Sequence, residues 1–359
     1  MSTRAVMRAA ASPPSGGDPR PHEERLLAQQ HAQLLGALAR ALPPGRSVVL
    51  LDIPNHANVG DNAILLGELA ALKALGRRAL YIPATPSSDG ARLQRRIGSR
   101  PILLHGGGNL GDLWPAHQHL RERILAEFPG NPIVQLPQSV AFSHADSIAR
   151  ARSAFERHRG FTLLVRDEQS RVFAAEHLGM RAILTPDAAF ALGRLRPSRP
   201  PQRDVLVLAR TDHEARAARR IPLGVATEDW TTPPVGLHER ALQRIARELD
   251  RRPGRGRAAS DALAHAAVLA WGGISMEHLR RGIELLGSAR VVVTDRLHAH
   301  ILSLLLGIPH VVTDNVSGKI RSFYETWTRE SELVTWADSL EQGVEIGRRL
   351  ASERIGKPL

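Results

Sequence analysis

The fold of this chain is decided by residues 47–84, SVVLLDIPNHANVGDNAILLGELAALKALGRRALYIPA. This stretch begins with a short apolar run that ends in Asp52, continues through a polar loop into an amphipathic segment at 62–76, and ends with a second apolar run at 78–84. The apolar runs do not alternate with polar residues, which is typical of parallel strands that are buried on both faces. The pattern therefore predicts a strand, a helix and a second strand of an α/β unit.

The same alternation of apolar runs and amphipathic segments continues in both directions along the chain. It is interrupted once, by GRLRPSRPPQRD, which is dense in Pro and Arg and is typical of an interdomain linker. Two Rossmann-like, doubly wound α/β domains that face each other across a cleft are therefore expected. The predicted boundaries are a disordered leader at 1–22, an N-terminal domain at 23–192, the linker at 193–204, and a C-terminal domain with C-terminal helices at 205–359.

Further elements are expected inside these domains. A helix is expected from Glu23 to Leu42, and PQS at 137–139 is read as the turn that closes a strand. Helix boundaries are less distinct between the first two predicted strands of the second domain, VLVLART and ARVVVTDR. The periodicity there predicts three helices, at 238–249, 261–271 and 275–286.

Composition restricts the class of protein. The 359 residues contain no Cys, which excludes disulfides, a thiolate zinc site and a cysteine nucleophile. No stretch has the apolar length of a signal peptide or a membrane span, so a cytoplasmic protein is expected. The net charge of +12 favours anionic partners, and it allows peripheral contact with the inner membrane surface. Aromatic residues make up only 4%, too few for stacking platforms that bind single-stranded nucleic acid.

Polar and glycine-rich loops follow the predicted strands of the first domain. Ligands of open parallel sheets bind beyond the carboxyl ends of the strands, so these loops are candidate binding elements. In IPNHANVGDNAI, Gly60 allows a tight turn and Asp61 or Asn62 can cap the next helix. In HGGGNLGDLWP, Gly107 allows close approach of the backbone to a ligand, and Asn109 offers both a donor and an acceptor. Gln138 of PQS can bind a sugar hydroxyl or shape the cleft.

Charged residues also follow strands, and they are most frequent in the second domain. Arg166 ends a strand in VRDEQS, where it either pairs with an acid or faces the cleft. Arg210 lies in ARTDHE, and Arg296 and His298 lie in TDRLHAH. The planar guanidinium of Arg296 suits a phosphate or a carboxylate. His300 is about 200° round the helix from His298, so the two need not share a face, and no metal site is predicted.

Two familiar motifs are absent from the sequence. No GKS or GKT follows a glycine-rich loop, which removes the main support for hydrolysis of ATP or GTP. The HGGG at 105–108 is also found in oxyanion holes of lipases, but no GxSxG elbow accompanies it. Both of these enzyme classes are therefore disfavoured.

The ordered motifs together resemble the polysaccharide pyruvyl transferase family, and most of all its branch in bacterial exopolysaccharide biosynthesis. The resemblance runs from about Leu51 to Trp327 and is weakest between roughly Arg216 and Arg290. The fold that it implies is similar to the two-domain glycosyltransferases of the GT-B type. The motifs that carry it are VGDNAI, HGGGNLGDLWP, PQS, VRDEQS, TPDAAF, RTDHE and TDRLHAHILSLLLGIPHVVTDN.

The resemblance implies transfer of the enolpyruvyl unit of phosphoenolpyruvate, as co-substrate and without a cofactor, to two hydroxyls of one sugar. The acceptor is then a saccharide of the polymer or its lipid-linked precursor. By resemblance, His298 is the general acid, Arg296 binds the donor, and Arg166 or Arg210 is the second anion ligand. The acceptor side of the cleft is assigned to Gly60, Asp61, Gly107, Asn109 and Gln138.

Three other hypotheses remain at this stage. A GT-B glycosyltransferase that uses a nucleotide sugar would need the same architecture and similar Arg and His residues. A basic nucleic-acid-binding protein would explain the charge but leaves the glycine-rich loops unexplained. A non-catalytic member of the family would keep the fold, although the acid and the arginines of the motifs are all present.

Overall fold

The computed structural model describes residues 21–84, 89–211, 227–231, 236–251 and 256–353. The leader predicted at 1–22 therefore falls outside the described residues except for its last two positions. Those two positions begin helix α2, which runs from Pro21 to Ala41, so the helix expected at 23–42 is confirmed with a small shift. Acidic side chains in its first turn and Arg40 in its last complement the helix dipole.

The described residues form two parallel sheets. The first has the strand order β2-β1-β3-β5-β6-β7, with β4 paired to β5. Its strands are β1 (Ser47–Leu51), β2 (Arg78–Tyr81), β3 (Ile102–Leu104), β4 (Gly107–Gly111), β5 (Ile133–Ala141), β6 (Phe161–Val165) and β7 (Ile183–Leu184). The second has the order β12-β11-β10-β8-β9, with β8 (Arg203–Leu208), β9 (Thr227–Glu228), β10 (Ala289–Thr294), β11 (His310–Val312) and β12 (Val334–Trp336).

Helices cover both faces of the first sheet, because alternate residues of its strands point to opposite sides. On one face Val49, Leu104 and Leu163 pack with the helices α4 to α7. On the other face Val48 and Leu103 pack with α2, α3 and α9. These helices are α3 (Val59–Ala74), α4 (Gly90–Ile97), α5 (Pro115–Glu127), α6 (Ala145–Arg157), α7 (Glu168–His177) and α9 (Arg257–Gly287). The expected mixed α/β fold with parallel sheets is thus confirmed.

The second sheet is covered in the same way. Leu208 and Val292 belong to a core that includes α10 and the end of α9, while Val207 and Val293 pack against α12. A 3-10 turn at Ala188–Leu192 (η2) joins the first core to the second, because Phe190 is buried among the residues of the second sheet's core. The remaining helices are α8 (Leu237–Arg251), α10 (Leu297–Leu306), α11 (Lys319–Phe323), the π-helical turn η3 (Tyr324–Thr328) and α12 (Leu340–Ser352).

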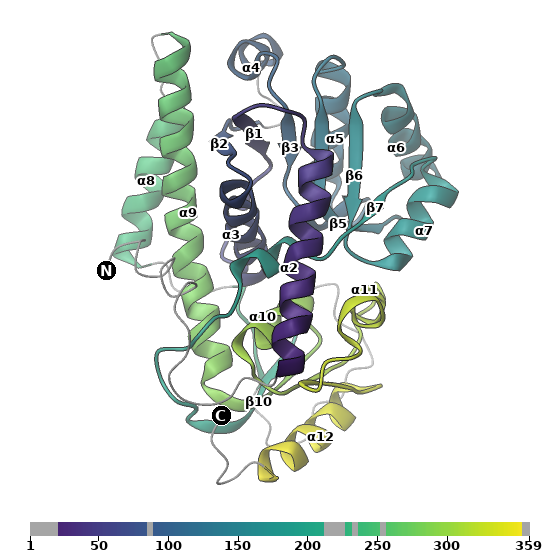
Figure 1. The fold of residues 1–359 in the computed structure, drawn as a ribbon, viewed down its shortest axis with the longest axis vertical. Helices are drawn as coiled ribbons and strands as arrows, with labels where there is room; N and C mark the ends of the chain where they lie inside the picture. The colour runs from purple at the N-terminus through teal and green to yellow at the C-terminus, as the bar shows by residue number, and fades with distance from the viewer. Residues whose placement is uncertain (1–20, 85–88, 212–226, 232–235, 252–255, 354–359) are drawn as a thin grey trace.

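Helix α9 contacts both sheets, and Figure 1 shows it running beside them. The prediction of two helices at 261–271 and 275–286 is wrong, since α9 continues through Gly272 and Gly273. Glycine weakens a helix, but here Trp271 packs in the core of the first sheet and Leu279 in that of the second. Tertiary packing on both sides of the glycines therefore keeps the helix continuous.

Two short segments that were expected to be loops are strands. Gly107–Gly111 forms β4, and PQS lies inside β5 instead of closing it. Pro137 lacks a backbone N–H, so it cannot contribute to a regular ladder, and the register between β5 and β6 shifts between Gln135 and Gln138. The shift accommodates the proline within a continuous strand.

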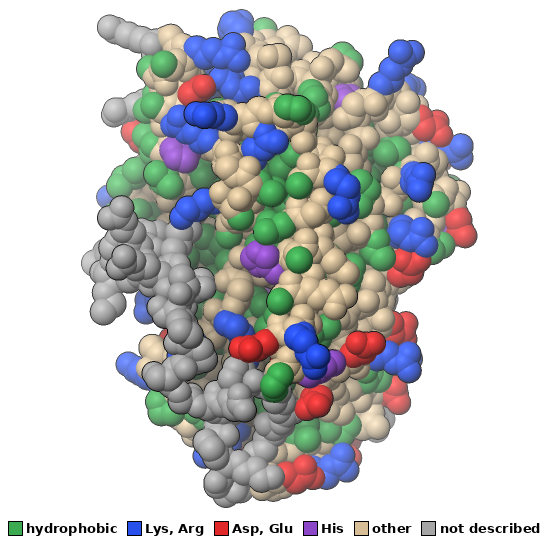
Figure 2. Space-filling model, viewed as in Figure 1, with side chains coloured by type: hydrophobic (Ala, Val, Ile, Leu, Met, Phe, Trp, Pro, Cys, Tyr) green, Lys and Arg blue, Asp and Glu red, His purple; other side chains and the backbone are tan. Residues whose placement is uncertain are grey.

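Among the residues that the structure describes, no helix is both long enough and apolar enough to cross a membrane. On the face shown in Figure 2, Lys and Arg side chains are spread over the surface, with Asp and Glu among them, mostly along its right edge and in its lower part. The excess of basic residues in the sequence is thus dispersed over this face.

Candidate active site

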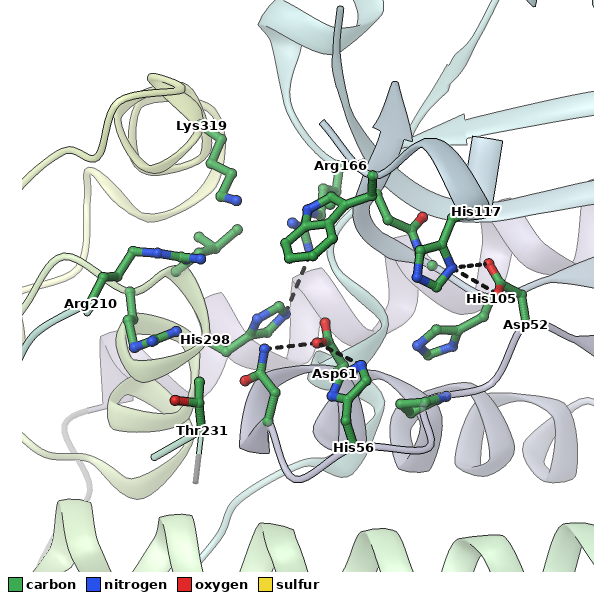
Figure 3. A pocket seen from close by; sticks show the side chains of 18 of the residues that line it. Asp52, His56, Asp61, His105, His117, Arg166, Arg210, Thr231, His298 and Lys319 are labelled. Carbon is green, nitrogen blue, oxygen red and sulfur yellow. Dashed lines mark hydrogen bonds and ion pairs between the residues drawn. The ribbon is translucent and has the colours of Figure 1, made fainter. Parts of the chain in front are cut away.

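A cavity of about 360 Å³ lies at the carboxyl ends of strands from both sheets. Charged side chains of both signs line it. Figure 3 shows Arg210 and Lys319 on one side, Asp52, His105 and His117 on the other, and His298 and Asp61 between them. The full lining comprises Asp52, Pro54, His56, Asn58, Asp61, His105, Gly106, Gly108, Asn109, Trp114, His117, Arg166, Arg210, Trp230, Thr231, Arg296, Leu297, His298 and Lys319.

The loop after β1 is fixed by its own side chains. Asn58 caps α3 by accepting a hydrogen bond from the Gly60 N–H at 3.1 Å, and its amide donates to Asp61 Oδ2 at 2.8 Å. Asn62 donates to the carbonyl oxygens of His56 and Asn58, both at 2.8 Å. The run of polar residues that the sequence places here therefore holds the start of α3 and directs Asp61 to the cavity.

Asp61 is a carboxylate with a side chain 29% exposed, and it lies among cationic groups. Burial by itself raises its pKa, but the charges of His56, His298, His105 and Arg166 outweigh that effect and lower the pKa below 3.8. The carboxylate is therefore ionised at neutral pH. An ionised carboxylate accepts hydrogen bonds and does not donate them, which suits it to bind hydroxyl groups.

His298 is in the first turn of α10, and its ring faces a carboxylate from the other half of the chain. Its Nε2 lies 3.4 Å from Asp187 Oδ2 and 3.4 Å from Arg166 Nη1. Asp187 caps η2 by accepting from the Ala189 N–H at 2.8 Å, so the carboxylate has a fixed position. A histidine oriented by a fixed carboxylate is a typical proton-transfer group.

Arg166 lies deep in the wall, where it pairs with that same carboxylate. Its Nη1 donates to Asp187 Oδ2 at 2.7 Å, and its Nε donates to Ser139 at 3.0 Å. The Ser139 hydroxyl in turn donates to Asp167 at 2.6 Å. Burial raises the pKa of Asp187, but the charges of His298 and Arg166 and the hydrogen bond with His298 lower it far below 3.8 overall. Arg166 therefore neutralises Asp187 and keeps it next to His298.

The absence of a side chain at Gly60 leaves room for the His298 ring. A Cβ at position 60 would lie 2.5 Å from His298 Nδ1, 2.7 Å from its Cγ and 2.9 Å from its Cβ. These distances are shorter than any real contact, so the ring rests directly on the glycine backbone. Gly60 thus belongs to the site as the floor beneath the imidazole, although it does not itself line the cavity.

Replacing Gly60 by alanine is expected to move the His298 ring and to lower turnover about 100-fold, because catalysis is sensitive to displacements near 1 Å. The fold should tolerate the change, since alanine favours a helix more than glycine does. Steady-state activity and thermal unfolding check this. The matched control is Gly36→Ala in α2, where the nearest atom to a new Cβ would be Arg40 Nη1 at an ordinary 3.4 Å. Unchanged activity in Gly60→Ala would show that the position of the His298 ring does not depend on Gly60.

Cationic side chains from the second sheet form the opposite wall. Arg210 follows β8, and Arg296 follows β10. Lys319 begins α11 and also faces the cavity in Figure 3. Arg296 is held by Asp229, whose Oδ2 accepts from Nη2 at 2.6 Å, and the Arg210 N–H donates to Asp295 at 2.7 Å. Together these residues give this wall a positive charge.

Fewer of the predicted residues of the glycine-rich segment line the cavity than the sequence analysis expected. Asn109 lines it, and its Oδ1 accepts from Gln138 at 2.7 Å and from Arg121 at 3.1 Å. The amide nitrogen is therefore the group that Asn109 can offer to a ligand. Gln138 is fully buried and also donates to the carbonyl oxygen of His105 at 3.1 Å, so it shapes the wall from behind. Gly107, with φ of 125°, likewise lies outside the lining, which Gly106 and Gly108 supply.

The structure thus brings six of the nine site residues predicted from the sequence to one cavity: His298, Arg296, Arg210, Arg166, Asp61 and Asn109. Gly60, Gly107 and Gln138 lie behind the wall. The rest of RTDHE, Asp212, His213 and Glu214, lies outside the described residues. His300 points into the core, where it bonds to His310 at 2.7 Å and to Thr328 at 2.9 Å.

Sequence reasoning missed several residues of this candidate site. Asp187 stood in the quoted motif TPDAAF, and a carboxylate between two apolar stretches was a signal for a buried partner. Asp52 directly follows β1. Its φ of 63° is a left-handed conformation unusual for a residue other than glycine, and its carboxylate oxygens lie 2.8 and 2.9 Å from His117 Nδ1. A strained backbone costs about 1–3 kcal/mol and is common at functional sites. Lys319 carried no signal in the sequence.

Comparisons with known proteins agree with these motifs. The family described as polysaccharide pyruvyl transferase matches residues 58–317. Pyruvyl transferase 1 of Schizosaccharomyces pombe is 37% identical over 307 residues, covering 79% of this chain and 70% of that protein. EpsO of Bacillus subtilis, which carries the name of a pyruvyl transferase, is 31% identical over 299 residues, covering 82% of this chain and 89% of that protein.

A solved structure of a functionally uncharacterised protein from Klebsiella pneumoniae has the same fold. Its TM-score is 0.52 at 17% sequence identity, and the match covers 90% of this chain and 100% of that chain. The structural likeness shows the fold alone, so the family assignment rests on the sequence relatives and on the matched family. This chain belongs to the polysaccharide pyruvyl transferase family, and it is a transferase enzyme of polysaccharide biosynthesis.

Proposed function

We propose that this enzyme transfers the enolpyruvyl unit of phosphoenolpyruvate to two hydroxyls of one sugar, forming a cyclic pyruvate ketal on an exopolysaccharide or its lipid-linked precursor. The observation that carries the proposal is the division of the cavity into a cationic wall and a wall of hydroxyl-binding groups, with His298 between them. A doubly anionic donor and a neutral diol acceptor would need such a division.

The donor binds on the cationic wall in this proposal. Arg296 and Arg210 bind its phosphate and carboxylate, since planar guanidinium groups match both anions, and Lys319 adds a third positive charge. Arg166 has a different task in this proposal. Its Nη1 and Nε are already bound to Asp187 and Ser139, so its main task is to hold the carboxylate beside His298.

The acceptor sugar binds on the opposite wall. Asp61 accepts a hydrogen bond from a sugar hydroxyl, and the Asn109 amide donates one to an oxygen of the ring substituents. The Asp52–His117 pair extends this polar surface. Trp114, 38% exposed, offers an indole face for the apolar side of a sugar ring.

Proton transfer by His298 starts the reaction. The imidazolium donates its proton to the methylene carbon C3 of the donor, and one sugar hydroxyl attacks the adjacent carbon C2 as cationic character develops there. Phosphate leaves C2, and the second hydroxyl closes the ring. Of the two hydroxyl protons, one replaces the proton delivered to C3 and the other leaves with phosphate, so that the imidazolium is regenerated.

We also propose that the two sheets belong to two Rossmann-like domains of a GT-B-type arrangement, with the acceptor side at 23–192 and the donor side at 205–359. The occurrence of one sheet on each side of 193–204 supports this division. The division into two domains is not complete, because helix α9 packs on both sheets and joins them. A lipid-linked acceptor would be met at the inner membrane surface, which the positive net charge favours.

The test measures phosphate release from phosphoenolpyruvate by the purified protein, with lipid-linked oligosaccharide extract and a panel of nitrophenyl hexosides as acceptors. We expect acceptor-dependent release and a product whose mass has gained a pyruvate ketal. Turnover of a nucleotide sugar without any release from phosphoenolpyruvate would overturn the proposal in favour of a glycosyltransferase.

A further inference from the structure

A further histidine–carboxylate pair, His105–Glu68, lies in the cavity wall and has no part in the reaction as described so far. His105 directly follows β3 and is only 3% exposed. Its Nδ1 is 2.8 Å from Oε2 of Glu68, which is itself buried in α3. The other carboxylate oxygen of Glu68 accepts from the Gly106 N–H at 2.7 Å. Glu68 therefore fixes both the ring and the backbone that follows it.

The backbone on the other side of His105 is fixed as well. Its carbonyl oxygen accepts hydrogen bonds from Gln135 at 2.9 Å and from Gln138 at 3.1 Å. A ring held by its own Nδ1 and by its main chain cannot turn without breaking buried hydrogen bonds. The position of the remaining ring nitrogen is therefore determined by the fold.

That remaining nitrogen, Nε2, is buried and has no hydrogen-bond partner among the described residues. Leaving a buried polar atom unpaired costs about 1–3 kcal/mol, so such atoms are rare and call for an explanation. His105 lines the cavity beside Asp61, on the side away from Arg210 and Lys319. A group bound in the cavity is thus the available partner for Nε2.

The charges around the ring control its protonation. Burial lowers the pKa of His105, but the charge and hydrogen bond of Glu68 and the charges of Asp61 and Asp52 outweigh burial, and the pKa is raised above 6.5. Since Nδ1–H is donated to Glu68, neutral His105 carries its free electron pair on Nε2. The arrangement has the geometry of a general base whose strength is increased by a carboxylate.

We infer that His105 is the second catalytic residue and that its Nε2 accepts the proton of the attacking sugar hydroxyl. This inference rests on the proposed function. The O–H bond breaks as the C2–O bond forms, while His298 gives its proton to C3. His105 then releases its proton to solvent, the departing phosphate takes up one proton from solvent, and the second hydroxyl restores the proton of His298. Each imidazole thus ends the cycle in the state in which it began.

Two isosteric variants separate this role from a structural one. In His105→Asn the side-chain amide can still donate to Glu68, as Nδ1 does, but nothing replaces Nε2. In His105→Gln an amide occupies the region of Nε2 and can bind a hydroxyl, but it cannot accept a proton. If His105 transfers a proton, both variants lose turnover by about 10²–10⁴-fold, the range of general acid–base catalysis. The KM for phosphoenolpyruvate should stay within a few-fold, because the donor binds on the other wall.

The pH profile gives a second readout that a structural histidine would not affect. In the wild type the rate should rise with pH through the raised pKa of His105, because only the neutral ring is a base. This acidic limb should disappear from the residual activity of both variants, whereas His298→Gln should retain it. Addition of imidazole to His105→Ala should restore part of the turnover.

Other results would overturn the inference in distinguishable ways. Near-wild-type turnover in His105→Asn would assign the residue a structural role, and near-wild-type turnover in His105→Gln would reduce it to a hydroxyl ligand. The proposed function survives in both cases, because the wild type still releases phosphate. Absence of release from the wild type with every acceptor would remove the proposed function and the inference with it.

Discussion

His298→Gln is expected to lower turnover by about 10²–10⁴-fold, the usual contribution of a general acid. The glutamine amide can keep a hydrogen bond to Asp187, but it has no acidic proton that it could transfer to the donor at neutral pH. The KM for phosphoenolpyruvate should change little, because the guanidinium groups of Arg210 and Arg296 remain. Steady-state phosphate release at varied donor concentration measures both constants.

The control for this variant is His119→Gln, the same substitution at an exposed position of α5 outside the cavity lining. It should leave turnover and the midpoint of thermal unfolding unchanged. His298→Gln should lower that midpoint slightly, because it removes the charge beside Asp187 while Arg166 still pairs with that carboxylate. Wild-type turnover in His298→Gln would remove the residue from the reaction.

Asp187→Asn is expected to affect stability and activity together. The asparagine Oδ1 can still cap η2, but Arg166 loses its counter-charge while it remains 1% exposed. An uncompensated buried charge costs about 3–5 kcal/mol. Turnover should also fall by about 100-fold or more, because the carboxylate that orients His298 is gone. Denaturant unfolding and phosphate release, both below the unfolding transition, measure the two effects.

A double variant separates the two effects of Asp187. In Asp187→Asn/Arg166→Gln the buried pair is neutral, so the free energy of unfolding should recover much of its loss. Turnover should stay low, because His298 still lacks its carboxylate. The partly exposed pair Arg100–Asp261 is the control, and Asp261→Asn should cost much less stability. Restored turnover in the double variant would contradict the orienting role of Asp187.

The stability effect of Asp187 should depend on pH in a defined direction. The pKa of this carboxyl is lowered in the folded protein, so its contribution is complete at pH values above 3.8, the ordinary carboxyl pKa. The contribution is lost as the pH falls towards the lowered folded-state pKa. The difference in unfolding free energy between wild type and Asp187→Asn should therefore be largest at neutral pH and shrink in acid. A difference that is independent of pH would show that the charge is not its cause.

The amino-acid sequence by itself determined the α/β class, the parallel strands and the motifs that identify the family. Apolar runs without alternation, such as SVVLL at 47–51, have this consequence because a strand buried on both faces has no polar side. The sequence also indicated Arg296 and His298, because both immediately follow a buried strand whose carboxyl end opens on a ligand site.

Only the tertiary structure decided which of these residues meet. Asp187 and His298 are 111 positions apart and contact each other because η2 and the start of α10 pack together. The space for His298 depends on the absence of a side chain at Gly60, and the orphan nitrogen of His105 depends on the buried Glu68. These are contacts between segments far apart in the chain, and local periodicity cannot report them. The continuous helix α9 has the same cause, since packing on two sheets outweighs the helix-weakening effect of Gly272 and Gly273.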